Sequence, residues 1–404
     1  MQIIYAGESF PTTVTSSLFL AGPSPRETEV KSWRKEALEL LEKMNYQGHV
    51  FVPEGRDGKP RPDYDDNAQW EEDGLNRADC IVFWIERDMS PSSTGAPKLP
   101  GLTTNDEWGV WKNSGKVVLG LGNDVSVRYQ KYYALKNKVS IFNSLQTTLV
   151  GALSLIKNGA QRVGGESEVP LLIWNTESFQ NWYSGQKSAG NRLDGCRIEY
   201  SFRVGPTKNF VFLWIAHVNV YIVSENRNKT NELVIGRPDI STVLLWRKGK
   251  DLLDTDVVIV KEFRSPSRTS DGFIRELPGG SSKKNNDVRT IAAEEVHEEV
   301  GLVISPDRLI HVGTRQIGGT LSSFSGNCFS CELTDLEIEK IKYYMDSNAV
   351  FGIQSETERT YVQLFKLKDL IDKELTDWST LGMIFTGLRS TIIKTSFAMN
   401  FIES

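Results

Sequence analysis

Ile81-Val-Phe-Trp-Ile85 is an uninterrupted apolar run in the first half of the 404-residue chain. A run of this kind predicts a strand that is covered on both faces, as the strands of parallel sheets are. Leu18-Phe-Leu-Ala21 and Val50-Phe-Val52 are shorter runs of the same character, and each is closed by a proline-containing turn. We therefore expect three buried strands in this half of the chain.

Segments with helical spacing alternate with these strands. In residues 27–44 the apolar side chains Val30, Trp33, Ala37 and Leu41 recur at three- and four-residue intervals. Further segments follow in the same way: a helix over 67–78, a helix over 106–113, a strand over 116–121 and a helix over 125–135. The alternation predicts an α/β fold with a doubly wound parallel sheet, which binds ligands at the carboxyl ends of its strands.

The second half of the chain has a different pattern. Residues 157–169 (KNGAQRVGGESEV) combine glycine and charge without periodicity, which predicts a linker. Three β-branched and aromatic runs follow, at 211–223, 242–246 and 257–263, and then a strong helix over 287–299 and weaker helices near 336–345 and 381–396. We therefore expect a doubly wound domain over 1–156, a linker over 157–169 and an α+β domain with an N-terminal β extension over 170–404.

Composition excludes several classes of function. The net charge of −5 gives no basic surface for nucleic acid, and no apolar stretch approaches the ~20 residues that span a membrane. The N-terminus lacks the basic and apolar regions of a secretory signal, so we expect a cytoplasmic protein. Cys328 and Cys331 have CxxC spacing but no second pair of ligands nearby, which favours two reduced thiols over a zinc or redox site.

The most specific pattern is a glutamate-rich helix behind a Gly-Gly turn. Glu295, Glu298 and Glu299 lie three and four residues apart, so on a helix they share one face. Carboxylates this close repel one another unless a cation lies between them, and Mg²⁺ (or Mn²⁺) prefers such oxygen ligands together with phosphate oxygens. Glycines at 279 and 280 allow the backbone to approach phosphate closely. The alternative is a solvated acidic helix face.

This segment resembles the signature box of the Nudix hydrolases at Gly280, Glu295, Val296, Glu298, Glu299, Gly301 and Leu302. Upstream, residues 257–264 and 273–280 are similar to strands of the branch that hydrolyses ADP-ribose and nucleoside diphosphate sugars. The resemblance implies a Nudix fold and Mg²⁺-dependent hydrolysis of a nucleoside diphosphate derivative. It implies that Glu295, Glu298 and Glu299 bind the metal and that Glu298 and Glu299 are catalytic. It also implies that substrate contacts come from Arg264, Glu276 and Gly280.

Two positions depart from the Nudix pattern: Asn286 replaces the first box glutamate, and Glu294 replaces the box arginine. These changes leave open an alternative, a nucleotide-binding sensor whose Nudix domain is not catalytic. Glu356 and Glu358 fall where this branch often has an additional catalytic carboxylate, although solvated loop charge explains them equally well.

Three stretches of the first half are similar to the nucleoside 2-deoxyribosyltransferase-like family, over most of residues 14–145. They are Phe19-Leu-Ala-Gly-Pro-Ser-Pro-Arg26, the segment from Gln69 through Ala78-Asp79 to Trp84, and Gly101-Leu-Thr-Thr-Asn-Asp-Glu107-Trp-Gly109. The resemblance implies cleavage or transfer of the N-glycosidic bond of a nucleoside or nucleotide. A carboxylate suits this chemistry because it stabilises, and then captures, an oxocarbenium-like sugar.

The residues that match the family's functional positions are as follows. The resemblance assigns the nucleophile to Glu107 and the second, proton-handling carboxyl group to Glu71. It assigns substrate contacts to Ser24, Arg26, Asp79 and Thr104, with Ser24 and Arg26 suited to a 5′-phosphate. Each has a simpler interpretation: Glu107 as a favourable charge near a helix N-terminus, Glu71 and Arg26 as surface charges, and Asp79 as a structural residue.

One departure concerns the first strand, where many relatives have an active-site tyrosine and this chain has Phe19. The sequence leaves open whether water or a second base accepts the sugar. Both families usually form homo-oligomers, so the resemblance implies one here, with a small nucleoside or nucleotide as the substrate. The leading hypothesis is a bifunctional nucleotide-processing enzyme, and a structural module built on two inactive enzyme folds is a third reading.

Overall fold

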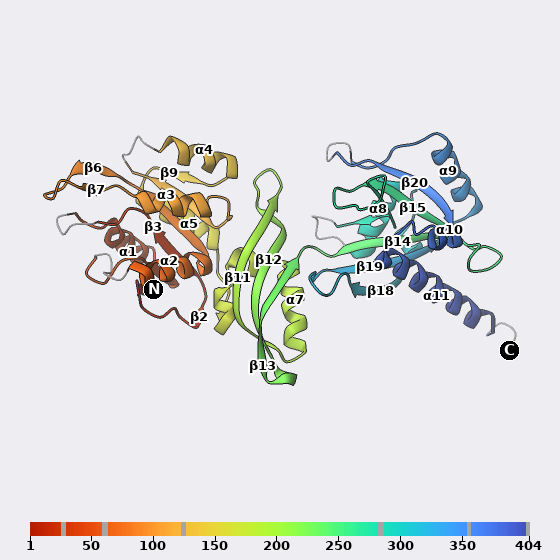
Figure 1. Cartoon of the computed structure of the whole chain (residues 1–404), viewed down its shortest axis with the longest axis horizontal. Helices are drawn as coiled ribbons and strands as arrows, with labels where there is room; N and C mark the ends of the chain where they lie inside the picture. The colour runs from red at the N-terminus through yellow and green to blue at the C-terminus, as the bar shows by residue number, and fades with distance from the viewer. Residues whose placement is uncertain (26–29, 59–63, 123–126, 282–286, 354–356, 401–404) are drawn as a thin grey trace. The chain divides into compact units, whose positions relative to one another are not determined.

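The computed structural model describes residues 1–25, 30–58, 64–122, 127–281, 287–353 and 357–400. The chain divides into two compact units, Met1–Arg237 (unit 1) and Pro238–Ser404 (unit 2). Figure 1 shows a parallel sheet and a separate three-stranded sheet in unit 1, and a larger mixed sheet in unit 2.

The first sheet of unit 1 confirms the predicted parallel architecture. Among the described residues it has six strands, and every pair of neighbours in it runs parallel. In spatial order the strands are β1 (Gln2–Tyr5), β4 (His49–Val52), β3 (Ser17–Ala21), β5 (Cys80–Ile85), β8 (Val117–Leu121) and β9 (Ile141–Phe142).

Helices cover both faces of this sheet. Successive residues of a strand point to opposite faces, so a strand that is apolar throughout needs a core on each side. Leu18 and Leu20 of β3 pack with α1 (Trp33–Lys43) and α5 (Leu145–Ile156). Phe19 and Ala21 belong to a second core on the other face, which is covered by three helices, α2 (Tyr64–Arg77), α3 (Leu102–Trp111) and α4 (Arg128–Asn137). The doubly wound arrangement follows from these two cores.

The order of the strands locates a crevice. From β3 the chain passes to β4 on one side, and it then returns across β3 to enter β5 on the other side. Ligands of doubly wound folds bind at such a switch, outside the carboxyl ends of the strands. Here the switch lies between β3 and β5, and Gly22 follows β3 at that edge.

Unit 1 continues well beyond the parallel sheet. It includes a three-stranded antiparallel sheet of β11 (Arg192–Val204), β12 (Phe210–Ile222) and β13 (Arg227–Gly236), packed against α6 (Leu171–Trp174) and α7 (Glu177–Ser188). The predicted linker, residues 157–169, contains β10 (Arg162–Val163) and a short 3-10 helix η1 (Gly164–Glu168). Strand β10 pairs with β2 (Thr13–Val14). The structural division therefore falls at Arg237, later than the position predicted from composition.

A buried ion pair explains why the segment 157–169 is packed. Both side chains of the Arg162–Asp79 pair are fully buried, and Arg162 donates to the two carboxylate oxygens of Asp79 at 2.7 and 2.6 Å. The same carboxylate accepts the backbone N–H of Leu171 at 2.7 Å and the backbone N–H of Ser17 at 2.8 Å. Asp79 thus joins strand β3 to two segments that come more than 80 residues later in the chain.

Unit 2 is built on a seven-stranded sheet, counted over the part of the chain that the structure describes. Its path is β16 (Phe273–Glu276), β15 (Asp256–Phe263), β14 (Ile240–Arg247), β19 (Ser325–Glu332) and β18 (Ile310–Gln316), with β17 (Gly279–Gly280) paired to β14 and β20 (Thr360–Lys366) paired to β15. Strands β14 and β19 are parallel, and the other pairs are antiparallel.

Helices cover this sheet on two faces. One core includes residues of α8 (Val288–Val300) and α9 (Asp335–Asp346), and the other includes residues of α10 (Leu367–Asp372) and α11 (Trp378–Asn400). Helix α8, predicted over 287–299, begins after Asp287, whose side chain accepts the N–H of Thr290, and ends at Gly301 in the left-handed conformation. The assignment of this unit to the Nudix fold stays a prediction.

The remaining elements are short. They are the hairpin β6 (Asp88–Pro91) and β7 (Pro97–Leu99) and the 3-10 helices η2 (Val223–Glu225) and η3 (Pro306–Arg308). Cys328 and Cys331, on β19, are free and buried, and burial raises the pKa of each thiol to about 11. No helix in the described part of the chain has the length and apolar character needed to cross a membrane.

Candidate active sites

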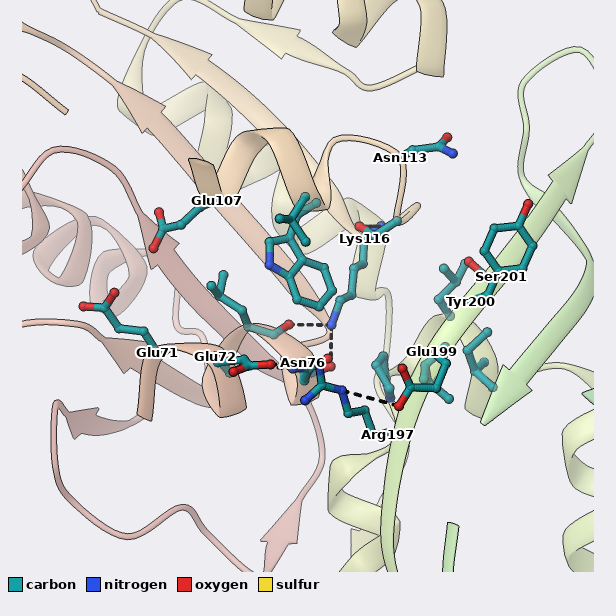
Figure 2. Close-up of a pocket in the computed structure, with 18 of the residues that line it drawn as sticks. Glu71, Glu72, Asn76, Glu107, Asn113, Lys116, Arg197, Glu199, Tyr200 and Ser201 are labelled. Atoms are coloured by element: carbon teal, nitrogen blue, oxygen red, sulfur yellow. Dashed lines mark hydrogen bonds and ion pairs between the residues drawn. The ribbon is translucent and has the colours of Figure 1, made fainter. Parts of the chain in front are cut away.

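Glu107 and Glu71 lie on neighbouring helices of unit 1. Glu107 is in the second turn of α3, which begins after Gly101, and Glu71 is in the middle of α2. Figure 2 shows that both carboxylates point to the same side, away from β11. Because the effect of a helix N-terminus is confined to the first turn, a simple dipole interaction does not explain the position of Glu107.

The pKa values of both carboxyl groups are raised, and Glu71 contributes to the shift of Glu107. The pKa of Glu107 is raised to about 8, first by burial and then by the charge of Glu71. Burial also raises the pKa of Glu71, while Arg34 and a hydrogen bond from Asn67 (2.8 Å to Oε1) lower it. Carboxyl groups whose pKa values are raised by burial and by a neighbouring charge are suited to acid–base catalysis.

Arg34 organises the crevice beside these carboxylates. It is on the buried face of α1, and its guanidinium donates to the carbonyls of Leu20 (2.9 Å) and Gly22 (2.8 Å), which end strand β3. It also donates to Ser24 Oγ at 3.0 Å and forms a buried ion pair with Glu54 at 2.5 Å. With these acceptors Arg34 is a positioning residue, and its positive charge favours ionised Glu71 and Glu107.

Sequence reasoning missed both Arg34 and Glu54. The available signal was the helical spacing of Arg34, Ala37 and Leu41, which places the arginine on the apolar face of α1. A buried arginine needs a carboxylate partner, and Glu54 is the second residue after the neighbouring strand β4. Glu54 also accepts the hydroxyl hydrogen of Ser32, the N-cap residue of α1, at 2.7 Å.

The other predicted residues of unit 1 lie in different surroundings. Ser24 is half-buried beside Arg34, and Thr104 is buried inside α3 with 1% of its surface exposed. Asp79 precedes β5 at the amino edge of the sheet, opposite to the crevice, and Arg162, Ser17 and Leu171 occupy its oxygens. This placement corrects the substrate-binding assignment of Asp79 and favours its structural interpretation. Arg26 lies outside the described residues.

Phe19 stands where many relatives have an active-site tyrosine. Its side chain is fully buried and makes only apolar contacts. A Cβ on Gly74 of α2 would come within 2.9 Å of the Phe19 ring, so helix and strand are in close contact there. Phe19 also packs at a ring-centroid distance of 6.3 Å from Trp70. The ring therefore supports α2, the helix that carries Glu71, and contributes no polar group.

Comparison with known families bears on this same region. Residues 15–125 match the family described as "Nucleoside 2-deoxyribosyltransferase like". The matched segment includes β3, the Arg34 cluster, Glu71 and Glu107. A search of curated proteins gives no match for the chain. The deoxyribosyltransferase-like segment covers the crevice and its two carboxyl groups but ends before β9.

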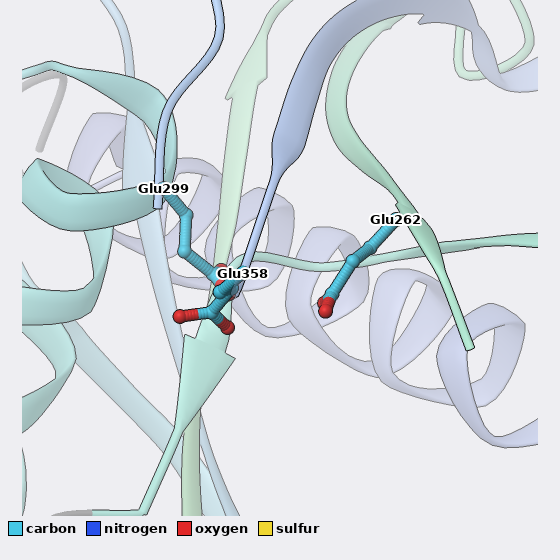
Figure 3. A group of neighbouring side chains, drawn as sticks. All are labelled: Glu262, Glu299 and Glu358. Carbon is cyan, nitrogen blue, oxygen red and sulfur yellow. The ribbon is translucent and has the colours of Figure 1, made fainter. Parts of the chain in front are cut away.

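Unit 2 brings a different group of carboxylates together. Ligand oxygens of Glu262, Glu299 and Glu358 all lie within 4.8 Å of one another, and the first two residues are buried. Figure 3 shows the three side chains converging from β15, from the end of α8 and from the segment that enters β20. The register places Glu262 opposite Thr360, two residues after Glu358, which explains why these distant segments meet.

The ionisation of this trio is strongly perturbed. Burial raises the pKa of Glu299 well above its ordinary value, although its Oε2 accepts the backbone N–H of Gly279 at 2.8 Å. Burial raises the pKa of Glu262 to about 7, against the opposing charge of Arg264, whose guanidinium lies 2.7 Å from Glu262 and 3.3 Å from Glu276. A cation between the carboxylates would offset their mutual repulsion.

The predicted ligand set Glu295, Glu298 and Glu299 is only partly brought together. Glu299 belongs to the trio, and Glu295 lies against the Gly-Gly turn, where a Cβ on Gly280 would come 2.6 Å from its Oε1. Glu298, in contrast, is exposed, because consecutive helical residues point about 100° apart. Its predicted role as a metal ligand and catalytic residue beside Glu299 is therefore not what the geometry favours.

Five further positions complete the comparison with the sequence. Glu358 was one of two alternatives for an additional carboxylate and is in the trio, whereas Glu356 and Asn286 lie outside the described residues. Glu294 is exposed on α8. Glu262 was missed, because its neighbours in sequence form an ordinary β-branched strand and only the pairing with β20 reveals its partners.

Proposed function

We propose that unit 1 cleaves or transfers the N-glycosidic bond of a nucleoside or nucleotide, with Glu107 as the nucleophile. The observation that carries this proposal is the pair Glu107 and Glu71, whose carboxylates point to one side of α2 and α3 beside the crevice, within the deoxyribosyltransferase-like segment. A pair of carboxyl groups with separated roles is what glycosyl transfer through a covalent intermediate needs.

The proposed reaction has two steps. In the first, an oxygen of ionised Glu107 bonds to the anomeric carbon as the carbon–nitrogen bond breaks, and the departing base takes the electron pair and a proton from Glu71. In the second, water or another base attacks the anomeric carbon, Glu71 takes the proton, and Glu107 is released. Burial raises the pKa of Glu71, which is the direction that favours a proton donor. Arg34 keeps the strand end and Ser24 in place.

The test is product analysis with purified protein. Incubation with a panel of ribonucleosides, deoxyribonucleosides and their 5′-monophosphates should release free base, or exchange it when a second base is present. Glu107→Gln should abolish this release because the amide is a poor nucleophile, and Glu36→Gln, an exposed glutamate on α1, is the matched control. Release of base at an unchanged rate by Glu107→Gln would refute the assignment.

For unit 2 we propose Mg²⁺- or Mn²⁺-dependent hydrolysis of a nucleoside diphosphate derivative. The supporting observation is the trio Glu262, Glu299 and Glu358, which offers hard oxygen ligands to a divalent cation. The donor set fits such an ion, with Glu295 and the Gly279–Gly280 turn next to it. When bound, the metal would polarise a phosphoryl oxygen and lower the pKa of a water molecule.

The residues around the proposed metal have separate roles. Glu299 is fixed by the N–H of Gly279 and would hold the ion, and the carboxylate of Glu295 lies beside it against Gly280. Glu262, whose pKa is raised to about 7 by burial, would hold the ion together with Glu299 and Glu358. Arg264 is partly exposed and offers a positive charge to substrate phosphate.

Turnover with a panel of nucleoside triphosphates, ADP-ribose, NAD and UDP-glucose, followed by mass analysis, tests this proposal. Glu299→Gln should abolish metal-dependent cleavage and leave base release by unit 1 intact. The matched control is Glu339→Gln, an exposed glutamate on α9. If either Glu299→Gln or Glu107→Gln removes both activities, the proposal of two separate sites is wrong.

A non-catalytic sensor remains the second candidate for unit 2, because Glu294 adds negative charge to α8 where a hydrolase of this family carries an arginine. Nucleotide binding without turnover in Mg²⁺ or Mn²⁺ supports the sensor, and rapid turnover excludes it. If both units are active, hydrolysis in unit 2 would supply a nucleoside monophosphate from which unit 1 releases the base.

A further inference from the structure

Glu71, the proposed proton donor of unit 1, is hydrogen-bonded by a neighbour on its own helix. Asn67 and Glu71 lie four residues apart on α2, so they share one side of the helix. Asn67 Nδ2 donates to Glu71 Oε1 at 2.8 Å, in a part-buried contact. One carboxylate oxygen of Glu71 is therefore committed to this amide, and Oε2 is the oxygen that the amide leaves uncommitted.

The carbonyl half of the Asn67 amide is unsatisfied. Its Oδ1 is buried and has no hydrogen-bond partner within the part of the chain that the structure describes. A buried acceptor without a partner lowers the stability of a fold, and each such exception needs an explanation. A leucine at this position would remove the cost, so stability alone does not account for the asparagine.

A second pair on α2 provides a comparison. Gln69 Nε2 donates to Asp73 Oδ1 at 3.1 Å, again across four residues, but this contact is exposed to solvent. Water competes there for both groups, so the hydrogen bond fixes neither of them. The contact between Asn67 and Glu71 has the same chemistry in a partly dry setting, where it can fix the carboxyl group.

The charged groups around Glu71 come from other helices. Burial raises the pKa of Glu71, and the charge of Arg34 on α1 and the amide hydrogen bond lower it. From α3, Glu107 faces Glu71, and the charges of Glu71 and Asp106 raise the pKa of Glu107. Glu54 pairs with Arg34 at 2.5 Å. The amide differs from these charges because its hydrogen bond acts on one oxygen only.

We propose that Asn67 is a positioning residue that decides which oxygen of Glu71 carries the transferred proton. This inference rests on the glycosyl reaction proposed above. Because Oε1 already accepts the amide hydrogen, the proton of Glu71 resides on Oε2, and it passes from Oε2 to the departing base. In the second step Oε2 takes a proton from the attacking water or base, so both steps use the same oxygen.

Asn67→Leu tests the proposal, with Gln69→Leu as the matched control on the same helix. In Asn67→Leu the kcat of base release should fall about tenfold with KM unchanged, because a hydrogen bond to a charged group is lost and no substrate contact is removed. Its urea midpoint should equal or exceed that of the wild type, since the unpartnered acceptor is gone. Gln69→Leu should change neither quantity. An unchanged kcat, or a lower urea midpoint, in Asn67→Leu overturns the proposal.

A second measurement does not need turnover. The carboxyl carbon of Glu71 is followed by ¹³C NMR in glutamate-labelled protein and is assigned by its loss in Glu71→Gln. Its titration midpoint should rise in Asn67→Leu, because the amide no longer stabilises the carboxylate, and should rise further in Asn67→Asp, which adds a negative charge beside it. Identical midpoints in the variants and the wild type would contradict the proposal. If the midpoints shift but the wild type releases no base from any substrate, the contact is confirmed and the proposed reaction is wrong.

Discussion

Replacing Arg162 by methionine should destabilise unit 1 far more than any surface charge change. The substitution keeps most of the apolar stem but leaves Asp79 buried without its cation. Breaking a buried ion pair from one side typically lowers the free energy of unfolding by about 3–5 kcal/mol. Asp79 keeps the donors of Ser17 and Leu171, so we expect a loss near the lower end, about 3 kcal/mol.

Urea unfolding followed by tryptophan fluorescence measures this effect. Eight of the ten tryptophans lie before residue 238, so the signal reports mainly on unit 1. The control is Arg192→Met, which breaks the exposed pair with Asp194 and should lower stability far less than Arg162→Met does. If Arg162→Met loses no more than this control does, the segment 157–169 is not held in the way the structure indicates.

Further predictions concern the two sites. Base release should rise with pH through about 8, the pKa to which burial and Glu71 raise Glu107, in a profile of kcat/KM against pH. In the unfolded chain Glu107 ionises near pH 4.5, whereas in the folded chain it keeps its proton up to about pH 8, so stability falls as the pH rises between these values. Glu107→Gln removes this loss, and it should therefore raise the urea midpoint above pH 8 and leave it unchanged in acid. Gly22→Ala, which brings a Cβ to 2.4 Å from the Trp84 carbonyl oxygen, should lower stability by about 1–3 kcal/mol in the same urea experiment. Mg²⁺ at a hundredfold excess over its dissociation constant should stabilise unit 2 by about 2.7 kcal/mol in calorimetry, and not at all in Glu299→Gln.

The parallel sheet was predictable because its strands are short apolar runs. The runs at 18–21, 50–52 and 81–85 correspond to strands β3, β4 and β5, and their two-sided burial follows from their composition. Strand β1 and the pairing of β2 with β10 were not predictable in this way, because two- and four-residue strands carry too little pattern. The burial of Arg162, within the segment predicted as a linker, was not predictable either. It depends on the ion pair with Asp79, 83 residues earlier in the chain.

The site residues show the same difference between what the local sequence contains and what distant segments decide. Glu107 and Glu299 stand in motifs, so the local sequence was enough to select them as candidates. Arg34 and Glu262 contribute through pairing with distant segments, and only the fold reveals those partners. Glu298 shows the opposite failure, because the spacing rule allowed three glutamates on one face while the angle between consecutive helical residues separates Glu298 from Glu299.

The position of Asp79 has a consequence for the order of events during synthesis. The ribosome adds residues one at a time, and N-terminal segments generally begin to fold while the rest is being made. Strands β3 and β5 emerge long before Arg162, so the nascent sheet would have to enclose an unpaired carboxylate. Completion of the sheet should therefore wait until the arginine has left the exit tunnel, which makes the first 156 residues a poor choice for expression alone.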